Sequence, residues 1–502
     1  MLLFARAVHG QTTSEAFESG LRPAVRAIDD PPVRWTLEER MAHHGVPGVS
    51  VALIKGGEIR LAKGYGVRAS GGSERVDPQT VFSVGSLSKT AAALTALRLV
   101  GDGRIDLDTE VNRYLRSWRV PPAEVANGKP VTLRGLLSHS AGISVHGFAD
   151  YLPQERIPSL LQILDGSGPA KNAPIRVISE PGATSRYSGG GTTVASLVIA
   201  DVTNMTFEAA AEQLLFAPLG LSRSTYENPL PASFGNIANA HDRHGSPTAL
   251  PRGWHTFAET AASGLWTTPS DYARLLLALS DSTVAAEGGF LPPALARDAL
   301  TEVGPSPHGL GPRLEGAGRD RRMVHSGAND AYKAWYEVYP NRGEGVVIFT
   351  NGANGRALYK ELLRAIADQF GWPSHREVLV DDRTLAREQL VAIAAEYDAI
   401  SPEDDADWRG RFNAPEPFRL FVKGNALYMG EESFRVGLLR AERDPVRLHA
   451  VDEQTLVDEG GEYRLQIVQN AEGRDTGVHV WTAGQRARYA RVKRWSVTLP
   501  IG

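Results

Sequence analysis

The first hundred residues alternate between helical and strand-like spacing of apolar positions. Residues 34–45 (RWTLEERMAHHG) have helical spacing and end at a glycine, which predicts an amphipathic helix. Two strand-like runs follow, VSVALIK (49–55) and EIRLAKGYG (58–66), and the glycine pair between them indicates a β-hairpin. An Ala- and Leu-rich segment then predicts a helix that begins near Ser86 and stops near Gly101.

The middle of the chain, residues 105–285, has mainly helical patterns separated by long loops. The clearest helical patterns are 192–203, 205–216 and 270–280. Strand patterns return at 334–340 (AWYEVYP) and 344–351 (EGVVIFTN), and a helical pattern at 355–371 closes this region. Because strand pairs lie at both ends with helices between them, we expect one sheet built from distant parts of the chain beside an all-helical lobe. A cleft between the two is the expected place for a site.

From about residue 407 onward the pattern changes to short alternating runs separated by turns. These runs are 417–423, 426–430, 433–440, 446–451, 462–469, 477–482 and 486–493. About eight strands at this spacing predict a small antiparallel barrel or sandwich. We therefore expect four parts: an N-terminal extension (1–33), an α/β domain (34–375), a helical linker (376–406) and a β-domain (407–502).

Composition excludes several classes of site. The chain of 502 residues is 42% hydrophobic and 22% charged, which is typical of a soluble protein with a sizeable core. It has no cysteine, so disulfides, thiolate catalysis and cysteine-based metal sites are excluded. The net charge of -4 comes without a basic block, so nucleic-acid binding is not expected. The sequence contains no stretch of about 18 apolar residues, so no membrane span is predicted. The apolar run in MLLFARAV (1–8) is too short for a signal peptide.

The strongest chemical signal is the segment SLSK (86–89), which opens the predicted helix after the strand-like VFSVG (81–85). Residues three apart share one face of a helix, so Ser86 and Lys89 point into the same space. A serine hydroxyl becomes a good nucleophile when a base is in reach, and a buried lysine can lose its charge and act as that base. The unpaired N–H groups at the start of the helix favour an oxyanion beside Ser86. The four-residue pattern alone also arises by chance.

Two segments further along the chain make the SLSK pattern more specific. FSVGSLSKTAAAL (82–94) resembles the active-site helix of the serine β-lactamase and penicillin-binding-protein superfamily. RYSGGG (186–191) stands where that superfamily has a Tyr-x-Asn segment, and VHSGANDAY (324–332) where it has a Lys-Thr-Gly or His-x-Gly strand. Linking segments at 103–115, 131–143, 216–225 and 263–276 resemble the esterase and D-peptidase branch.

The resemblance covers about residues 35–370 and implies a fold. It implies an α/β (α+β) β-lactamase-like architecture, with an antiparallel sheet flanked by helices plus an all-helical lobe. Several peptidases of this branch carry a C-terminal lipocalin-like barrel, and the strand pattern after residue 407 is compatible with an antiparallel β-barrel of that kind. The superfamily is mostly exported, which favours a periplasmic or secreted protein over a cytoplasmic one.

Catalytic roles follow from the resemblance, one position at a time. Ser86 attacks the carbonyl and becomes acylated, while Lys89 and Tyr187 share the transfer of its proton; which of the two is the formal base stays open. His325 takes the place of the strand lysine and donates a hydrogen bond to Tyr187 or to a substrate carboxylate. The backbone N–H groups of Ser86 and Ala328 form the oxyanion hole. No cofactor and no metal are expected.

Other residues near the motifs have weaker assignments. The expected substrate-binding residues are Gly189, Gly327, Trp266 and Tyr332, with a core role equally open for the two aromatic side chains. The histidines His43, His44 and His139 are interpreted as structural. Gly189 replaces the Asn of the Tyr-x-Asn segment, which is expected to open space near the nucleophile. Together with the loss of a permanent charge at His325, this change points away from an efficient β-lactamase.

The leading hypothesis is a peptidase or amidase that cleaves small peptides through a Ser86 acyl-enzyme. A narrower version acts on linear peptides with non-standard residues, similar to the hydrolases that process opened cyclic cyanobacterial toxins. The first alternative is an esterase on short acyl esters, and the second is a non-catalytic penicillin-binding or sensor protein. A metal hydrolase is disfavoured because the sequence has no His-Glu-x-x-His segment. The expected partner is a small peptide or acyl ester, and oligomerisation is left open.

Overall fold

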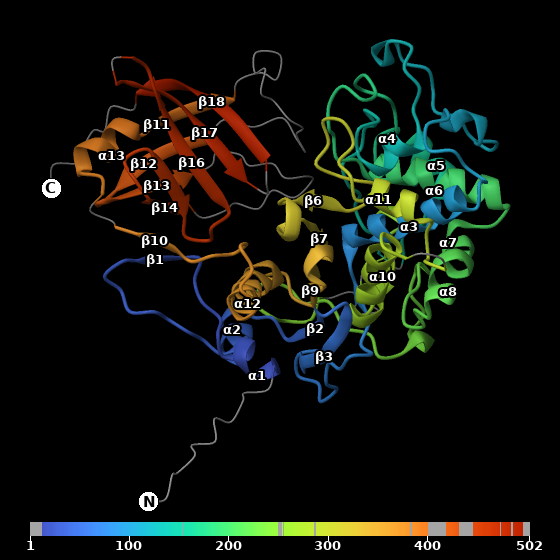
Figure 1. Cartoon of the computed structure of the whole chain (residues 1–502), viewed down its shortest axis with the longest axis horizontal. Coiled ribbons are helices and arrows are strands. Elements are labelled where there is room, and N and C mark those ends of the chain that lie inside the picture. The colour runs from blue at the N-terminus through green and yellow to red at the C-terminus, as the bar shows by residue number, and fades with distance from the viewer. Residues whose placement is uncertain are drawn as a thin grey trace, which may run out of the picture.

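The computed structural model describes residues 13–152, 154–248, 254, 256–285, 288–381, 384–399, 418–430, 445–471, 473–482 and 485–494. In these residues, a sheet flanked by helices adjoins a helical lobe, and a closed β-barrel lies beside them (Figure 1). The expected β-lactamase-like α/β architecture and the expected C-terminal antiparallel barrel are therefore both present.

The central sheet has six antiparallel strands in the order β3-β2-β9-β8-β7-β6. The strands are β2 (Gly48–Lys55), β3 (Glu58–Gly66), β6 (Arg313–Glu315), β7 (Arg322–Ala328), β8 (Lys333–Tyr339) and β9 (Glu344–Thr350). The N-terminal hairpin β2–β3 joins the C-terminal strands of the sheet because β2 pairs with β9. In this pairing Val49 lies opposite Thr350. The prediction of one sheet built from distant parts of the chain is thus confirmed.

Helices cover both faces of this sheet. On one face lie α1 (Thr13–Glu18), α2 (Leu37–His44) and α12 (Gly355–Phe370), whose apolar side chains share a core with β2 and β9. The helix predicted at 34–45 is α2, which has a capping box at Thr36 and ends at Gly45 in the left-handed conformation. Phe17 and Leu21, from the range predicted as an N-terminal extension, are fully buried in the same core, so this part of the range packs on the sheet domain.

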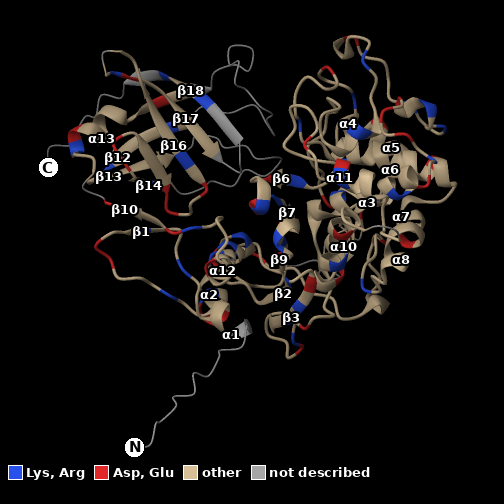
Figure 2. Cartoon of the chain, in the orientation of Figure 1, with Lys and Arg blue, Asp and Glu red and all other residues tan. Residues whose placement is uncertain are grey.

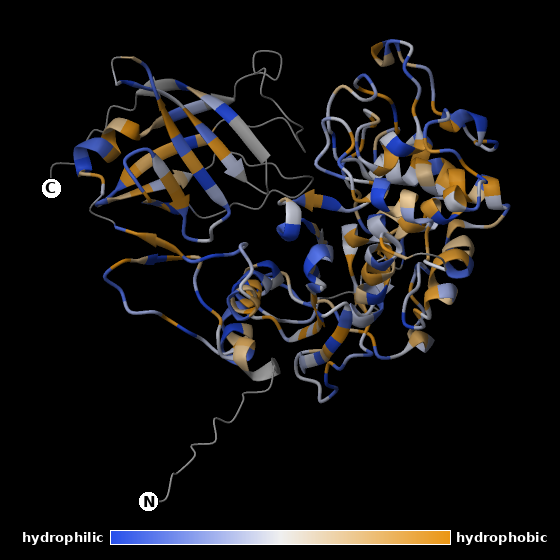
Figure 3. Ribbon diagram, viewed as in Figure 1, coloured by the Kyte–Doolittle hydropathy of each residue, from blue (hydrophilic) through white to orange (hydrophobic). Residues whose placement is uncertain are grey.

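The other face of the sheet packs against α10 (Pro269–Ser282) and shares a core with α3 (Ser88–Gly101), in which Thr90 hydrogen-bonds Tyr336 of β8; both helices lead into the helical lobe. The remaining helices of the lobe are α4 (Leu133–Leu137), α5 (Leu160–Asp165), α6 (Gly189–Thr203), α7 (Phe207–Ala211), α8 (Ala217–Leu219), α9 (Thr260–Ser263) and α11 (Pro293–Ala299). Both α3 and α6 are buried over most of their length, and Figure 3 shows hydrophobic residues gathered on these helices. Two short strands, β4 (Phe82–Ser83) and β5 (Trp266–Thr267), pair at the boundary with the sheet domain.

The barrel is closed by eight antiparallel strands. They are β11 (Ala395–Ala399), β12 (Phe418–Lys423), β13 (Ala426–Gly430), β14 (Val446–Ala450), β15 (Thr455–Asp458), β16 (Tyr463–Gln469), β17 (Asp475–Thr482) and β18 (Gln485–Arg494). The predicted linker 376–406 was wrong in part: it holds the helix α13 (Arg387–Ile393) but also β11, which pairs with β12 and β18 to close the barrel. The strand expected at 433–440 lies outside the described residues.

In the part of the chain that the structure describes, the barrel contacts the sheet domain through β1 (Val25–Ala27), β10 (Val378–Val380) and α12. The parallel pair of β1 with β10 runs beneath the barrel, and Val457 of β15 packs against it. Glu462 beside β16 forms ion pairs with Arg356 and Lys360 of α12. Acidic and basic residues are otherwise interspersed over both parts (Figure 2). Among the described residues, no single helix has the length and hydropathy of a membrane span; α6 joined to α7–α8 passes that test as a pair bent by 78°.

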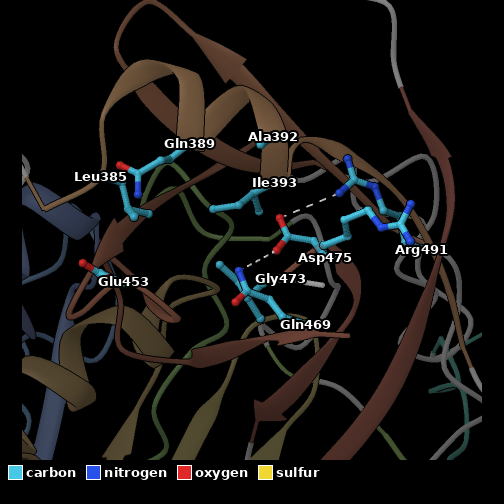
Figure 4. Close-up of a pocket in the computed structure, with 11 residues that line it drawn as sticks. Leu385, Gln389, Ala392, Ile393, Glu453, Gln469, Gly473, Asp475 and Arg491 are labelled. Atoms are coloured by element: carbon cyan, nitrogen blue, oxygen red, sulfur yellow. Dashed lines mark hydrogen bonds and ion pairs between the residues drawn. The ribbon is translucent and has the colours of Figure 1, made fainter. Parts of the chain in front are cut away.

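The inside of the barrel is packed, with a hollow at the end that α13 covers. Leu420, Leu465 and Val478 are fully buried in its core. Between α13 and the β16–β17 hairpin lies a cavity of about 590 Å³ (Figure 4). On its wall Asp475 accepts a hydrogen bond from Gln469 at 3.1 Å and faces Arg491 at 3.8 Å. The side chains of the barrel core thus fill its centre, and the cavity lies at the end that α13 covers.

Candidate active site

Ser86 lies in a short turn that the core holds rigidly. The turn is the 3-10 helix η1 (Gly85–Leu87), so α3 begins two residues later than Ser86 rather than at it. Buried tyrosines anchor this turn: Tyr226 donates its hydroxyl to the Ser88 carbonyl at 2.6 Å and Tyr272 donates to the Leu87 carbonyl at 2.8 Å. Ser88 turns away from the site and donates to the Gly85 carbonyl at 2.6 Å. Ser86 itself stays partly open to solvent.

Lys89 reaches the serine from one turn further along. Its Nζ lies 3.0 Å from Ser86 Oγ and donates to the carbonyl of Ala262 in α9 at 2.8 Å. The side chain is 4% exposed, and burial lowers the pKa of Lys89 to about 7. A large share of the amine is therefore neutral near pH 7, and its lone pair can accept the proton of Ser86.

Tyr187 comes to the same point from the loop before α6. The Lys89 Nζ lies 5.0 Å from the centre of its ring. Burial raises the pKa of the Tyr187 phenol, and a hydrogen bond with Ser86 offsets this only in part. The phenol is thus protonated at neutral pH. The hydroxyl, the amine and the phenol, which are distant in the sequence, meet at one place.

His325 has a tautomer that its hydrogen bonds define. Its Nδ1 lies 2.7 Å from the carbonyl oxygen of Ser326, which can only accept, so Nδ1 carries the proton and Nε2 is bare when the ring is neutral. Burial and the Lys89 charge lower the pKa of His325 to about 4. Its ring centre is 5.9 Å from that of Tyr187. At neutral pH, Nε2 can therefore accept a hydrogen bond but cannot donate one, which differs from the donor role expected from the sequence.

The end of β7 docks directly on the turn that carries Ser86. A Cβ atom at Gly327 would lie 1.9 Å from the Val84 carbonyl oxygen, and one at Gly85 would lie 2.9 Å from the Ala328 nitrogen. Asn329 N donates to the Tyr332 carbonyl, so Asn329 and Tyr332 form a hydrogen-bonded pair. Hydrogen-bonded and non-hydrogen-bonded pairs alternate along antiparallel strands, so the preceding pair, Ala328 opposite Lys333, is not hydrogen-bonded. The Ala328 N–H therefore points away from β8. The two glycines thus let this N–H approach the Ser86 turn, as an oxyanion hole requires.

The expected substrate-binding residues occupy different environments. Trp266 and Tyr332 are buried in the core, their rings 5.6 Å apart, and Tyr332 donates its hydroxyl to the Ala238 carbonyl. This burial accounts for both side chains by packing. The expectation that Gly189 opens space near the nucleophile is wrong, because a Cβ atom at Gly189 would lie 2.8 Å from Cε2 of Phe148. The ring of Phe148 already fills the space that the missing Asn side chain would use.

Three histidines beside Tyr187 are the main surprise of the site. The ring centres of His139 and His146 lie 4.4 and 5.0 Å from that of Tyr187, and His308 lies 4.9 Å from His139. Burial lowers the pKa of all three, to about 4 for His146 and well below the usual range for the other two. The aromatic shell around Tyr187 is therefore uncharged at neutral pH. In the sequence the only signal was the position of His139 within VTLRGLLSHSAGI.

His139 holds the tyrosine loop on both sides. Its carbonyl accepts from Arg186 N at 2.7 Å and its Nδ1 accepts from Ser188 N at 3.2 Å. His139 adopts a left-handed backbone conformation, with φ of 60°, which a non-glycine residue rarely keeps without a compensating role. The interpretation of His139 as structural thus needs refinement, since the part it fixes is the segment that carries Tyr187. Within the described residues, no group of three or more His, Cys, Asp or Glu side chains is arranged to hold a metal ion.

Comparison with known proteins identifies relatives of the sheet domain and helical lobe. Residues 33–369 match the family described as "Beta-lactamase". Penicillin-binding protein 4 of Amycolatopsis lactamdurans is 26% identical over 346 residues, which are 66% of this chain and 87% of that protein. Protein flp of Staphylococcus aureus (strain MW2) is 22% identical over 329 residues, which are 63% of this chain and 61% of that protein. The chain therefore spans less than two thirds of the length of flp.

Two solved structures share the fold. The octameric penicillin-binding protein homologue from Pyrococcus abyssi has a TM-score of 0.58 and 20% identity, and the match covers 90% of this chain and 98% of that one. A match of that extent includes the barrel region. The D-amino acid amidase from Ochrobactrum anthropi SV3 has a TM-score of 0.53 and 20% identity, covering 66% of this chain and 98% of that one.

Proposed function

This chain belongs to the beta-lactamase family, and from that premise we propose that it hydrolyses amide or peptide bonds of small peptides through an acyl-enzyme on Ser86. One observation carries the proposal: Ser86 Oγ lies 3.0 Å from a buried amine whose pKa is about 7. A lysine held this way serves as a base and has little use in a protein that only binds. Hydrogen bonding between Tyr187 and Ser86 supplies a second route for the proton.

In the proposed acylation, the scissile carbonyl lies over Ser86 with its oxygen between the N–H groups of Ser86 and Ala328. Neutral Lys89 takes the hydroxyl proton as Ser86 Oγ attacks, and the two N–H groups bear the charge of the tetrahedral oxyanion. Tyr187 gives its proton to the departing amine and regains one from the Lys89 ammonium, so the C–N bond breaks without a net change in enzyme charge. In deacylation a water molecule gives a proton to the same pair as its oxygen attacks the acyl carbon. The pair then passes that proton to Ser86 Oγ as the bond between Ser86 and the acyl carbon breaks, which restores the free enzyme.

We assign the base to Lys89 rather than Tyr187 for a physical reason. A general base works best when its pKa is near the working pH, and burial raises the pKa of the Tyr187 phenol while it lowers that of the Lys89 amine to about 7. The neutral Lys89 amine is therefore the group with a free lone pair beside Ser86. Tyr187 then acts as a proton carrier between Lys89 and the leaving group.

The properties of His325 disfavour substrates that would place a carboxylate beside its ring. Its bare Nε2 is an acceptor and its pKa of about 4 keeps it uncharged, so it offers no cation to a carboxylate. It suits an amide N–H or a neutral leaving group instead. This preference, and the fold shared with a D-amino acid amidase, support amides and small peptides. The same machinery also cleaves activated esters, so an esterase on short acyl esters remains the second candidate.

A matched substrate panel tests the proposal. We would compare kcat/KM for D- and L-amino acid amides, their p-nitroanilides and short dipeptides with that for p-nitrophenyl esters of the same acyl groups, using Ser86→Ala as the blank. We expect amide turnover that is abolished in Ser86→Ala, and a mass increase equal to the acyl group on wild type only. Turnover of esters without any amide would reject the peptidase assignment in favour of the esterase. Absence of any acyl-enzyme with every donor would reject both.

A further inference from the structure

We propose that Phe148 forms an aromatic wall on the acyl side of the site and selects substrates whose acyl group carries an apolar or aromatic side chain. The wall occupies the place where a Tyr-x-Asn segment presents an amide. This inference rests on the proposed function, because it concerns which acyl groups Ser86 accepts.

The position of Phe148 follows from the contacts of Gly189. A Cβ atom at Gly189 would lie 2.8 and 3.3 Å from Cε2 and Cδ2 of Phe148, and 3.1 Å from the His146 carbonyl oxygen. The Cβ direction is the one along which an Asn side chain at this position would extend. Gly189 lies two residues after Tyr187, and the phenyl ring of Phe148 occupies the space into which an Asn amide at 189 would extend. A Cβ atom at 189 therefore fits only if the Phe148 ring moves aside, and the His146 carbonyl narrows the space further.

The backbone that carries Phe148 is fixed to the tyrosine loop. Gly189 N donates to the His146 carbonyl and Gly190 N to the Val145 carbonyl, both at 3.0 Å, while Ser188 Oγ donates to the Ser144 carbonyl at 2.7 Å. Val145 has a φ of 62°, an unfavourable value for a β-branched residue, which persists only where neighbouring contacts impose it. Phe148 is therefore held in place by a hydrogen-bonded segment rather than by a loose loop.

The chemistry of this wall differs from that of an amide. Phe148 is half-buried, with part of its ring packed on the core and part left open. Two residues away, the ring centre of His146 lies 5.0 Å from that of Tyr187 with the two rings tilted, and His146 is neutral because burial and the Lys89 charge lower its pKa to about 4. An aromatic and uncharged surface gives no hydrogen bond to a substrate amide, but it offers dispersion contact and desolvation to an apolar group. The wall thus favours acyl groups such as phenylacetyl and disfavours small or charged ones.

The test measures a selectivity ratio. We would determine kcat/KM for p-nitrophenyl phenylacetate relative to p-nitrophenyl acetate in wild type, Phe148→Ala, Phe148→Leu and the control Phe290→Ala. Phe290 is also half-buried against the same core but contacts Arg98 instead of the site. We expect the ratio to fall about tenfold in Phe148→Ala, to change little in Phe148→Leu and to stay constant in Phe290→Ala. A ratio in Phe148→Ala within twofold of wild type would overturn the inference.

Restoring the motif gives a second, independent readout. Gly189→Asn alone should slow acylation strongly, because its side chain collides with the ring, whereas Gly189→Asn with Phe148→Gly should recover it. A single Gly189→Asn variant as fast as wild type would contradict the wall. Labelling of Ser86 by a fluorophosphonate in every variant distinguishes failure of this inference from failure of the proposed function. If Ser86 is labelled but the selectivity ratio does not change, only the role of Phe148 is rejected. If wild type neither reacts with the label nor cleaves the esters, the proposed function is rejected as well.

Discussion

Lys89 Nζ lies between two oxygens, 3.0 Å from Ser86 Oγ and 2.8 Å from the carbonyl of Ala262. The carbonyl accepts a hydrogen from the amine in either charge state, so it fixes the direction of the side chain without stabilising the charge as a carboxylate would. The Ser86 hydroxyl can donate to Nζ only when the amine has a free lone pair. Lys89 is 4% exposed, and this burial shifts the balance toward the neutral amine.

The first prediction concerns the pH dependence of acylation. Because Lys89 must be neutral to accept a proton and its pKa is about 7, kcat/KM should rise with pH through about 7 and level off above it. Lys89→Arg, which keeps the charge at all pH values, should lose at least about 100-fold in kcat/KM. The measurement is the pH profile of ester hydrolysis with a pH-independent leaving-group signal. A rise centred near pH 4 would point to His325 as the group that must lose a proton.

The second prediction is that the buried Lys89 amine destabilises the folded state. The pKa of Lys89 is lower in the folded protein than in the unfolded chain, so between about pH 7 and 10 the unfolded state binds more protons and stability rises with pH. At pH 7 the cost is on the order of a few kcal/mol. Lys89→Met should therefore raise the melting temperature at pH 7 while abolishing acylation. The gain should shrink when the comparison is made near pH 10, and a lower melting temperature for Lys89→Met at pH 7 would refute this account.

Much of this architecture was predictable from local patterns. The helix ending at Gly45, the hairpin around the Gly56–Gly57 pair and the strands near 334–351 all carry periodicities and turn residues that act over short distances. Ser86 and Lys89 share a face for the same local reason. The strand β11 was predicted as part of a helical linker because its strand character depends on pairing with β12 and β18 rather than on its own sequence.

The surroundings of the site depend on long-range contacts that no local pattern encodes. Phe148 lies beside Gly189, and His139 beside Tyr187, because backbone hydrogen bonds tie two loops together across some 40 to 50 positions. The loss of an Asn at 189 was visible in the sequence, but the ring that compensates for it was not. The charge state of His325 likewise depends on its burial and on the neighbouring Ser326 carbonyl.

The third prediction tests the close approach of β7 to the serine turn. Gly327→Ala would place a methyl group 1.9 Å from the Val84 carbonyl oxygen, which pushes the Ala328 N–H away from the oxyanion position. We expect kcat to fall by about 100-fold or more with a smaller change in KM, as for the loss of an oxyanion-hole donor. Ser326→Ala, one position earlier with an exposed side chain, is the matched control and should stay within about threefold. An active Gly327→Ala enzyme would argue against Ala328 as a donor. Circular dichroism checks that the fold is kept.

The fourth prediction concerns His139 as a positioning residue for Tyr187. His139→Ala removes the acceptor for Ser188 N and the ring beside Tyr187, so kcat should fall about tenfold or more while KM changes little. His139→Asn should recover part of that loss, because its amide oxygen can accept the same hydrogen bond and Asn tolerates a left-handed backbone. His43→Ala, at an exposed position of α2, is the control. Equal losses in the Ala and Asn variants with a lowered melting temperature would reduce His139 to a general stabilising role.

The fifth prediction concerns acid stability, away from the site. Glu337 in β8 is fully buried, and it pairs with Arg322 at 3.1 Å and His375 at 2.7 Å. Burial acts to raise the pKa of Glu337, but the charges of His375 and Arg322 and the hydrogen bonds prevail, so the pKa lies well below its usual range. A carboxyl whose pKa is lower in the folded state stabilises the fold above about pH 4.3, and this contribution fades as pH falls below that value.

Glu337→Gln should therefore lower the unfolding free energy at pH 7 by about 3 kcal/mol, since it removes the buried one of the two carboxylates that pair with Arg322 and leaves only Glu315. Glu58→Gln, at an exposed surface pair, should change it by less than about 0.5 kcal/mol. Urea unfolding at pH 7 and at pH 3.5 measures both variants against wild type. The deficit of Glu337→Gln should narrow at the lower pH, because part of the wild-type advantage is lost there. A deficit that is equal at the two pH values would mean that the carboxylate charge contributes nothing and that shape alone explains the loss.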